Sequence, residues 1–154
     1  MDAETSLPAG KDALRLWLRL LTCTALAEGE IRRRLRVEFG TTLPRFDLLA
    51  ALDRAPDGLT LGDVSRRMMV SNGNVTGLAA RMEAEGLVER RLDQGDRRAF
   101  RLRLTPAGQR AFSRQSRAHE SWVAELFGSL VPEDGQALHH LLGRAKHSIA
   151  KGIA

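Results

Sequence analysis

Residues 59–108 read LTLGDVSRRMMVSNGNVTGLAARMEAEGLVERRLDQGDRRAFRLRLTPAG, and the order of structural signals in this stretch decides the fold. Thr60 is followed three residues later by an aspartate, the spacing of a capping box, which predicts the start of a short helix. Ser71 is a second N-cap candidate, and apolar residues recur after it at three- and four-residue steps. The stretch therefore predicts a short helix followed by a longer helix that ends at Gly86.

The spacing of the apolar residues changes after this glycine from that of a helix to that of a strand. Val88, Arg90 and Leu92 alternate along the chain with Leu87, Glu89 and Arg91, and apolar residues alternate with arginines over 100–104, with a polar, glycine-containing loop between the two runs. This pattern predicts a β-hairpin. Another helix precedes the stretch, from an N-cap at Thr42 to a turn at 56–58. The order helix, short helix, longer helix and hairpin is typical of a winged helix-turn-helix.

Long helices flank this region on both sides. Apolar residues recur at helical steps over 12–39. Thr105 and Pro106, a cap and a proline at the first helical position, start a helix that we expect to reach about Leu130, and Pro132 starts a last one. We therefore expect a mainly α fold with a small β-hairpin wing, in which long dimerisation helices flank a winged helix-turn-helix core.

The apolar faces of the first and last helices exceed what the central lobe can cover, so a second copy of the chain is the simplest cover. A monomer with an elongated helical hairpin is the alternative. We divide the chain into an N-terminal arm and dimerisation helix (1–40), a DNA-binding lobe (41–108) and C-terminal dimerisation helices (109–154).

The composition is that of a folded, soluble protein. Among 154 residues, 24 Lys+Arg and 19 Asp+Glu give a net charge of +5, and 43% of the residues are hydrophobic. The longest uncharged run, Met68 to Ala80, has 13 residues, well short of the roughly 18 that a membrane helix needs. Asp2 and Glu4 stand where a signal peptide would be basic, and Cys23 is the single cysteine. We expect a cytoplasmic protein without a membrane partner.

Arginine dominates the cations, since lysine occurs only at 11, 146 and 151. A genome-wide bias towards arginine explains the count as well as a function does, so position has to decide. Between 86 and 104 six arginines face three acidic residues, a local charge of +3. Arginines at a hairpin tip suit a narrow minor groove. A loop whose aspartates and arginines pair with one another is the alternative.

The outward side of the longer helix is the second candidate for contact with DNA. Its residues are small or polar, and no acidic residue occurs before Glu83. Small polar side chains allow a close approach to a major groove, and Asn, Thr and Arg can read base edges or bind phosphates. A capped surface helix with incidental asparagines is the alternative. The predicted DNA-binding residues of helix and hairpin are Ser71, Asn72, Asn74, Thr76, Arg81, Arg97 and Arg98.

These motifs together resemble the MarR family of bacterial transcriptional regulators. The similar stretches are 59–68, 75–90 and, most tellingly, DQGDRRA at 93–99 followed by LTPAG at 104–108. The resemblance implies a homodimer whose first and last two helices interdigitate, and two winged lobes on successive major-groove faces of a near-palindromic operator. It also implies repression that a small molecule or an oxidant relieves. By the same resemblance, Arg98 matches a wing arginine that is important for DNA contact, and Asp96 matches its usual partner.

The resemblance further implies an effector site in the crevice between the dimerisation helices and the winged lobe. The residues that we expect to line it are Trp17, Leu21, Arg32, Phe46 and Phe112, with Leu49 and Trp122 as further candidates. Each of the apolar ones could equally belong to an ordinary core. The arginine run 32–34 is either a solvated helix end, where cations are favoured, or a clamp for an aromatic carboxylate or its coenzyme A thioester.

Other kinds of site find little support. Some relatives sense peroxide through a first-helix cysteine with tyrosines nearby, but this chain has no tyrosine, so we expect a structural role for Cys23. His140 and His147 have no cysteine near them and make a poor zinc site, and no catalytic motif or cofactor-binding motif occurs. We therefore expect a ligand-responsive repressor and not an enzyme. The alternatives are a non-specific architectural DNA-binding protein and a helical dimer that binds small molecules without acting on DNA.

Overall fold

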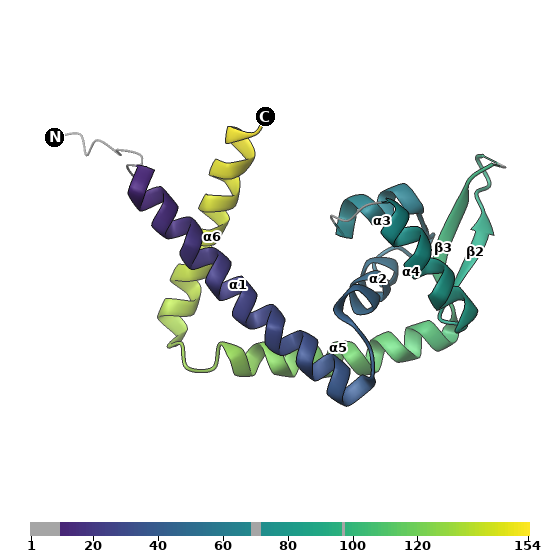
Figure 1. Ribbon diagram of the computed structural model, residues 1–154, viewed down its shortest axis with the longest axis horizontal. Coiled ribbons are helices and arrows are strands. Elements are labelled where there is room, and N and C mark those ends of the chain that lie inside the picture. Colours follow the sequence, from purple (N-terminus) through teal and green to yellow (C-terminus); the bar gives the residue numbers. More distant parts are fainter. Residues whose placement is uncertain (1–9, 69–71, 97) are drawn as a thin grey trace. The chain divides into compact units, whose positions relative to one another are not determined.

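The computed structural model describes residues 10–68, 72–96 and 98–154, and it divides into two compact units, 1–118 and 119–154. Its elements in chain order are α1 (Gly10–Phe39), α2 (Leu43–Asp53), β1 (Leu59–Thr60), α3 (Leu61–Met68), α4 (Asn72–Ala84), β2 (Val88–Leu92), β3 (Phe100–Leu104), α5 (Pro106–Leu126) and α6 (Pro132–Gly152) (Figure 1). The predicted class, mainly helical with a small sheet, is confirmed.

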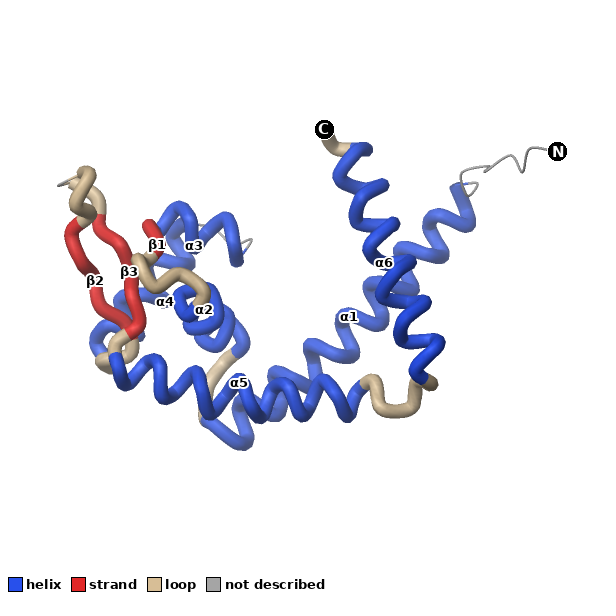
Figure 2. Tube along the Cα trace, turned by 180° about the vertical axis from the view of Figure 1, so that it is seen from behind, coloured by secondary structure: helices blue, strands red, loops and turns tan. Residues whose placement is uncertain are grey.

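The sheet is antiparallel, with strand order β1-β3-β2 (Figure 2). The predicted hairpin is present, and its register pairs Val88 with Leu104 and Leu92 with Phe100. The strand β1 was not predicted; it is only two residues long and pairs Leu59 with Leu102. The strand β1 leads directly into α3. Because β1 pairs with β3, it holds the start of the helix-turn-helix against the hairpin.

One core joins α2, α3, α4 and the sheet. The four residues predicted to form the buried side of α4, Val75, Leu78, Ala79 and Met82, are all buried. They pack with residues of the other elements: Leu48, Leu49, Leu52, Leu59, Val64, Val88 and Leu102. Because α4 is held along one side, its opposite side is turned away from the core.

The capping box predicted at Thr60 and the glycine predicted at the end of α4 are present, whereas the cap predicted at Thr42 is incomplete. The backbone N–H of Asp63 donates to Thr60 Oγ1 at 3.1 Å, and the N–H of Thr60 donates to Asp63 Oδ2 at 3.4 Å, which completes the capping box. Gly86 follows α4 with a φ of 77°. At Thr42 the extended backbone of an N-cap is present, but the side chain makes no capping hydrogen bond. The Oγ1 of the neighbouring Thr41 accepts from the side chain of Arg45, whose Nε lies 3.3 Å away.

The helix α5 ends at Leu126, four residues before the predicted end. A tight turn follows, in which the N–H of Gly128 donates to the carbonyl of Glu125 at 3.1 Å and that of Leu130 to Phe127 at 3.0 Å. The apolar residues in this turn continue the spacing of the helix, so periodicity alone extends it too far.

Large apolar side chains lie exposed on the long helices. In α1 these are Leu14, Leu16, Trp17, Leu18, Leu21 and Leu26. In α6, which has no buried residue, they are Leu138, Leu141, Leu142 and Ile149. Within the described ranges, no helix is long and apolar enough to cross a membrane.

Candidate nucleic-acid interface

The outward side of α4 carries small and polar residues. Gly73, Asn74, Thr76 and Arg81 are exposed, and Glu83 is the first acidic residue of the helix. Of the other predicted contacts on this element, Ser71 lies outside the described residues, and Asn72 begins the helix. An exposed helix side without negative charge can approach a polyanion closely.

Arg81 lies along this side of the helix. Its Nη1 is 3.6 Å from the point that a β-carbon would occupy on Gly77. The guanidinium thus lies across the preceding turn of α4, beside Gly77. In this position the guanidinium adds a positive charge to the predicted DNA-facing surface.

Three of the six arginines of the hairpin are engaged within the protein. Arg90 Nε lies 3.2 Å from Glu83 Oε2, and Arg91 Nε lies 2.9 Å from Glu89 Oε1. Arg101 Nε lies 3.3 Å from an oxygen of Asp93, and its Nη1 donates to the carbonyl of Gly58 at 3.2 Å. Only the pair of Arg101 with Asp93 matches the self-paired alternative, an aspartate and an arginine of the same hairpin. Because Glu83 lies outside the hairpin, its pairing with Arg90 means that the +3 overstates the charge that the hairpin can offer to DNA.

Arg98 differs from these arginines. Its side chain is exposed, and within the described part of the chain its guanidinium has no hydrogen-bond or ion-pair partner. Asp96 is its partner through the backbone, because Asp96 Oδ1 accepts from the N–H of Arg98 at 2.9 Å. The carbonyl of Asp96 also accepts from the N–H of Ala99 at 3.0 Å. The carboxylate thus shapes the turn that presents Arg98, while the neighbouring Arg97 lies outside the described residues.

An apolar pair lies next to Arg98. Leu92 is 60% exposed and Phe100, its partner across the hairpin, is 49% exposed. By strand alternation both lie on the same side of the hairpin as the buried Leu102. A hollow of about 270 Å³ is lined by Arg98 and Phe100 together with Thr60, Leu61, Arg90, Ala99 and Leu102. The described part of the wing end therefore combines the available cation of Arg98 with apolar surface.

An ion pair fixes the C-terminal end of α4 to α2. Arg45 Nη1 lies 3.1 Å from Glu85 Oε1, and Nη2 contacts the other carboxylate oxygen. Hydrogen bonding from the Arg45 guanidinium lowers the pKa of the Glu85 carboxyl below its ordinary value. The two residues are 40 positions apart, and no local pattern in the sequence indicates that they meet.

Of the residues predicted to bind an effector, the structure brings two together, and the others lie exposed on α1. Phe46 is buried and Phe112 half-buried, and their ring centroids lie 5.7 Å apart, so the structure brings this pair together. Trp17 and Leu21 are exposed on α1, and Arg32 Nη2 lies 3.6 Å from Glu28 Oε2.

The charges of the arginine run are largely balanced within α1. Arg33 and Arg34 both bind Glu30, at 2.7 and 2.8 Å. Their hydrogen bonds lower the pKa of the Glu30 carboxyl to about 2. Cys23 lies exposed in the same helix. Within the described ranges, no group of three or more His, Cys, Asp or Glu side chains could hold a metal ion.

Known proteins are similar to this chain in both sequence and fold. A model of the MarR family matches residues 39–99. The transcriptional activatory protein BadR of Rhodopseudomonas palustris is 32% identical over 134 residues, which cover 84% of this chain and 76% of BadR. A MarR family transcriptional regulator from Silicibacter pomeroyi has 34% identity and a TM-score of 0.78, with 93% of this chain and 99% of that chain covered. Sco3205 of Streptomyces coelicolor, solved in complex with DNA, shares the fold at 21% identity and a TM-score of 0.77, with 96% and 92% covered.

The winged lobe and the similarity of most of the chain to transcriptional regulators define the class of this protein. It is a winged-helix transcriptional regulator and not an enzyme. Within that class the chain belongs to the MarR family.

Proposed function

We propose that the protein is a homodimeric, ligand-responsive regulator that binds a near-palindromic operator. In this proposal α4 enters the major groove and the hairpin β2–β3 follows the flanking backbone, with Arg98 towards the minor groove. The main observation behind the proposal is that the two sides of α4 differ in burial and polarity. One side is fully buried, while the other is small, polar and free of acidic residues up to Glu83. That Sco3205, which shares the fold, was solved with DNA supports the same interpretation.

The dimer in this proposal is built from the segments 1–40 and 109–154, and the lobe 41–108 binds DNA. Its support is the apolar surface of the flanking helices. Trp17 is 53% exposed in α1, and Leu141 is 55% exposed in α6. Burying such side chains against a second copy is favourable by about 25 cal/mol per Å² of apolar surface. A regulator of this kind would act on chromosomal DNA in the cytoplasm.

The direction of regulation has two candidates. The family resemblance favours repression that an effector relieves. The name of BadR, a transcriptional activatory protein at 32% identity, favours activation. Among effectors, an aromatic molecule has better support than an anion, because the arginines at 32–34 are already paired with Glu28 and Glu30.

The test is a binding titration by fluorescence anisotropy against two duplexes, the promoter region of the protein's own gene and a shuffled sequence of equal length. We expect at least about a thousandfold preference for the promoter at physiological salt, the low end for specific DNA-binding proteins. Equal affinities that both fall steeply with salt would indicate the architectural alternative. Absence of any DNA binding would favour a helical dimer that binds small molecules only.

A further inference from the structure

One side of α6 carries a line of hydrogen-bond donors. His140, Arg144, His147 and Lys151 follow one another at steps of four, three and four residues. Steps of this size place side chains on one side of a helix. At about 1.5 Å per residue, the line extends over roughly 16 Å of the helix axis. We refer to these four residues as the α6 donor line.

The donor line lies opposite the exposed leucines of the same helix. His147 follows Leu138 by nine residues, and Lys151 follows Leu142 by nine. Nine residues are about two and a half turns of an α-helix, so the two members of each pair point in opposite directions. A second copy of the chain that covered the leucines would therefore leave the donor line accessible.

The four side chains are exposed and are not engaged within the protein. Over the described residues 10–68, 72–96 and 98–154, none of the four has a hydrogen-bond or ion-pair partner. The acidic residues of α6, Glu133 and Asp134, stand in its first turn. His140, the first donor of the line, comes seven residues after Glu133, or about 10 Å further along the helix axis. The part of the chain that the structure describes thus supplies no counter-ion to the line.

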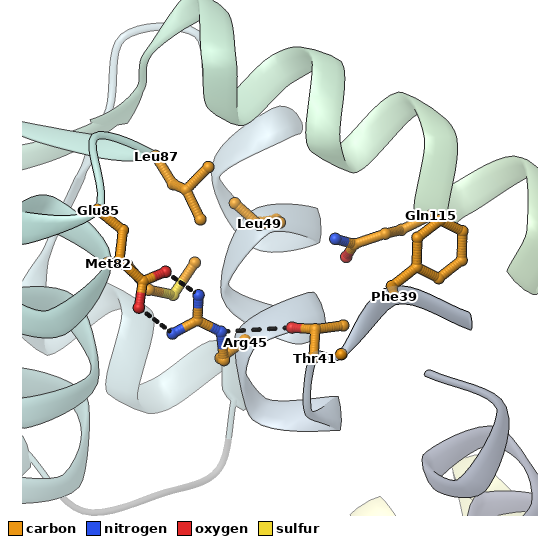
Figure 3. A pocket seen from close by; sticks show the side chains of 9 residues that line it. Phe39, Thr41, Arg45, Leu49, Met82, Glu85, Leu87 and Gln115 are labelled. Atoms are coloured by element: carbon orange, nitrogen blue, oxygen red, sulfur yellow. Dashed lines mark hydrogen bonds and ion pairs between the residues drawn. The ribbon is translucent and has the colours of Figure 1, made fainter. Parts of the chain in front are cut away.

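Arg45 provides a contrast within the same chain. A cavity of about 440 Å³ lies beside the C-terminal end of α4, within the unit 1–118. There Arg45 contacts both carboxylate oxygens of Glu85, and its Nε donates to Thr41 Oγ1 at 3.3 Å (Figure 3). An anion can bind Arg45 only by displacing Glu85, whereas an anion at the donor line displaces water alone.

A hollow of about 640 Å³ lies beside the donor line. The four donors line it together with His139, Gly143 and Ser148. Gly143 has no side chain, and a β-carbon at this position would meet nothing within 4 Å. The lining contains no acidic side chain, and its apolar surface comes from the carbon atoms of the imidazole rings and of the Arg144 and Lys151 stems. The volume lies within the range of small-molecule sites in proteins, about 300 to 1,000 Å³.

We propose that the α6 donor line and its hollow bind a linear polyphosphate chain. Arginine and lysine side chains only donate hydrogen bonds, and an imidazole donates an N–H in either protonation state. Ionised phosphoryl groups supply the acceptors that this set of donors lacks. Successive donors are about 4.5 or 6 Å apart along the helix axis, so a single phosphate contacts neighbouring donors only, whereas a chain of phosphoryl groups can follow the line.

The hollow favours a free molecule over a DNA backbone as the source of the phosphates. A duplex would contact the donors from outside and leave a hollow of this size unfilled, whereas a flexible phosphate chain can enter it. Inorganic polyphosphate and the phosphate chain of a nucleoside triphosphate share this chemistry. Arg144, in the middle of the line, binds the chain through two N–H groups of its planar guanidinium.

The first test compares tripolyphosphate with orthophosphate. Isothermal titration calorimetry measures both affinities with the full-length protein at pH 7 and physiological salt, without added divalent cations. We expect tripolyphosphate to bind at least about tenfold more tightly, the size of one additional charge-assisted hydrogen bond. A smaller difference would overturn the proposal, because a single phosphate would then satisfy the site.

The second test uses two variants with the same change in charge. Arg144→Gln should weaken tripolyphosphate binding by at least about tenfold. Arg117→Gln, the same change at an exposed position of α5, should leave the affinity within about twofold of wild type. Equal losses would mean that the net charge of the protein attracts the anion, and an unchanged affinity of Arg144→Gln would place the anion elsewhere. Either result would overturn the proposal.

An isotope label in the wild-type protein locates the site independently of any variant. With ¹⁵N-labelled histidine, tripolyphosphate should shift the imidazole resonances of His140 and His147 and leave that of His119 in α5 in place. Shifts at His119 alone would overturn the assignment to α6.

ATP, titrated in the same way, distinguishes the two sources of the chain. Binding of ATP at least as tight as that of tripolyphosphate, with the same loss in Arg144→Gln, would identify a nucleoside triphosphate. Weaker binding of ATP would identify an inorganic chain. Both results support the shared chemistry.

Fluorescence anisotropy with the promoter duplex separates this site from the DNA interface. Arg144→Gln should leave the affinity for DNA within about twofold of wild type. A larger loss would place the donor line in the DNA interface and overturn the proposal. A protein that binds tripolyphosphate at α6 but binds no DNA would refute the proposed function and leave this site standing.

Discussion

The winged lobe and the last helix contain similar apolar residues but use them differently. In the lobe, Val64, Val75 and Met82 are completely buried within a single chain. In α6 no residue is buried, and Leu141 is 55% exposed. The lobe can therefore stabilise itself, whereas α6 has an apolar face that only another surface can cover. The contrast separates the part that we expect to touch DNA from the part that we expect to join two chains.

The helix α1 contains both buried and exposed apolar residues. Near its C-terminal end Ile31 and Leu35 are buried, as in the lobe. Towards its N-terminal end Leu14 and Leu18 are more than half exposed, as in α6. A helix that changes character along its length is what we expect where a folded lobe passes into an interface between subunits.

The largest effect should come from a charge on the apolar face of α6. Leu141→Glu would bury an unpaired carboxylate in the proposed dimer interface, at a cost of about 3 to 5 kcal/mol. We expect monomers in analytical ultracentrifugation. We also expect the affinity for a two-half-site operator to fall by at least about a hundredfold, because the two lobes no longer bind together.

The matched control is Gln136→Glu, which introduces the same residue on the opposite side of α6, where the helix is polar. It should leave the protein dimeric and its affinity for DNA within about twofold of wild type. If both variants dissociated, the charge itself and not the apolar face would be responsible, and the comparison between lobe and helix would fail.

The second prediction compares the packing of the two regions through one Gly→Ala variant in each. A β-carbon on Gly108 would lie 2.0 Å from the carbonyl oxygen of Leu87, whereas one on Gly143 of α6 would meet nothing within 4 Å. We expect Gly108→Ala to lower the free energy of unfolding by about 3 kcal/mol through overpacking of backbone. Gly143→Ala should raise it by up to about 1 kcal/mol through helix propensity. Urea unfolding measures both, and equal changes would contradict the difference in packing.

The third effect separates DNA contact from stability within the lobe. Arg98→Ala should weaken operator binding by about tenfold to a hundredfold for each half-site, the size of a charge-assisted hydrogen bond, and leave the melting temperature unchanged. The slope of its salt dependence should fall by about two units, because the dimer no longer neutralises one phosphate in each half-site.

Arg91→Ala is the control for this prediction, because Arg91 is paired with Glu89 and should contribute little to DNA binding. Similar decreases in both variants would mean that the total charge on the hairpin matters more than the guanidinium of Arg98. Unchanged affinity of Arg98→Ala at physiological salt would refute the role that we give to the wing.

What the sequence could predict follows from the range of the interactions. The capping box at Thr60, the end of α4 at Gly86 and the alternation of the hairpin are all set by neighbours a few residues apart. The polar side of α4 follows from helical periodicity in the same way. The strand β1 was missed because two residues cannot show alternation.

Interactions between distant residues could not be predicted in this way. The Arg45–Glu85 pair joins two helices across 40 positions. The cavity that this pair borders depends on four separate segments of the chain. Counting charges in the hairpin likewise overestimated its positive surface, because pairing partners such as Glu83 of α4 lie outside the hairpin. The positive charge counted over a segment is therefore an upper limit, and pairing in the folded protein reduces the charge that the segment exposes.

The smallest effect concerns the capping box, which belongs entirely to the lobe. Asp63→Ala removes the acceptor of the Thr60 N–H and should lower the free energy of unfolding at pH 7 by about 1 kcal/mol. The Thr60 side chain, and to a lesser extent the Arg66 guanidinium, hold the pKa of the Asp63 carboxyl below its ordinary value. A carboxylate with a lowered pKa stabilises the folded state fully above the pKa of the unfolded chain, about 3.9.

The difference in stability between wild type and Asp63→Ala should therefore stay constant from pH 7 to about pH 5 and shrink as the pH falls through about 4. Urea unfolding at pH 7, 5 and 3 measures it, with Asp57→Ala, a change at an exposed turn residue, as the control. A difference that grew on acidification would mean that the protonated carboxyl is the form that the lobe stabilises. The capping box at the start of α3 would then have to act through packing and not through its charge.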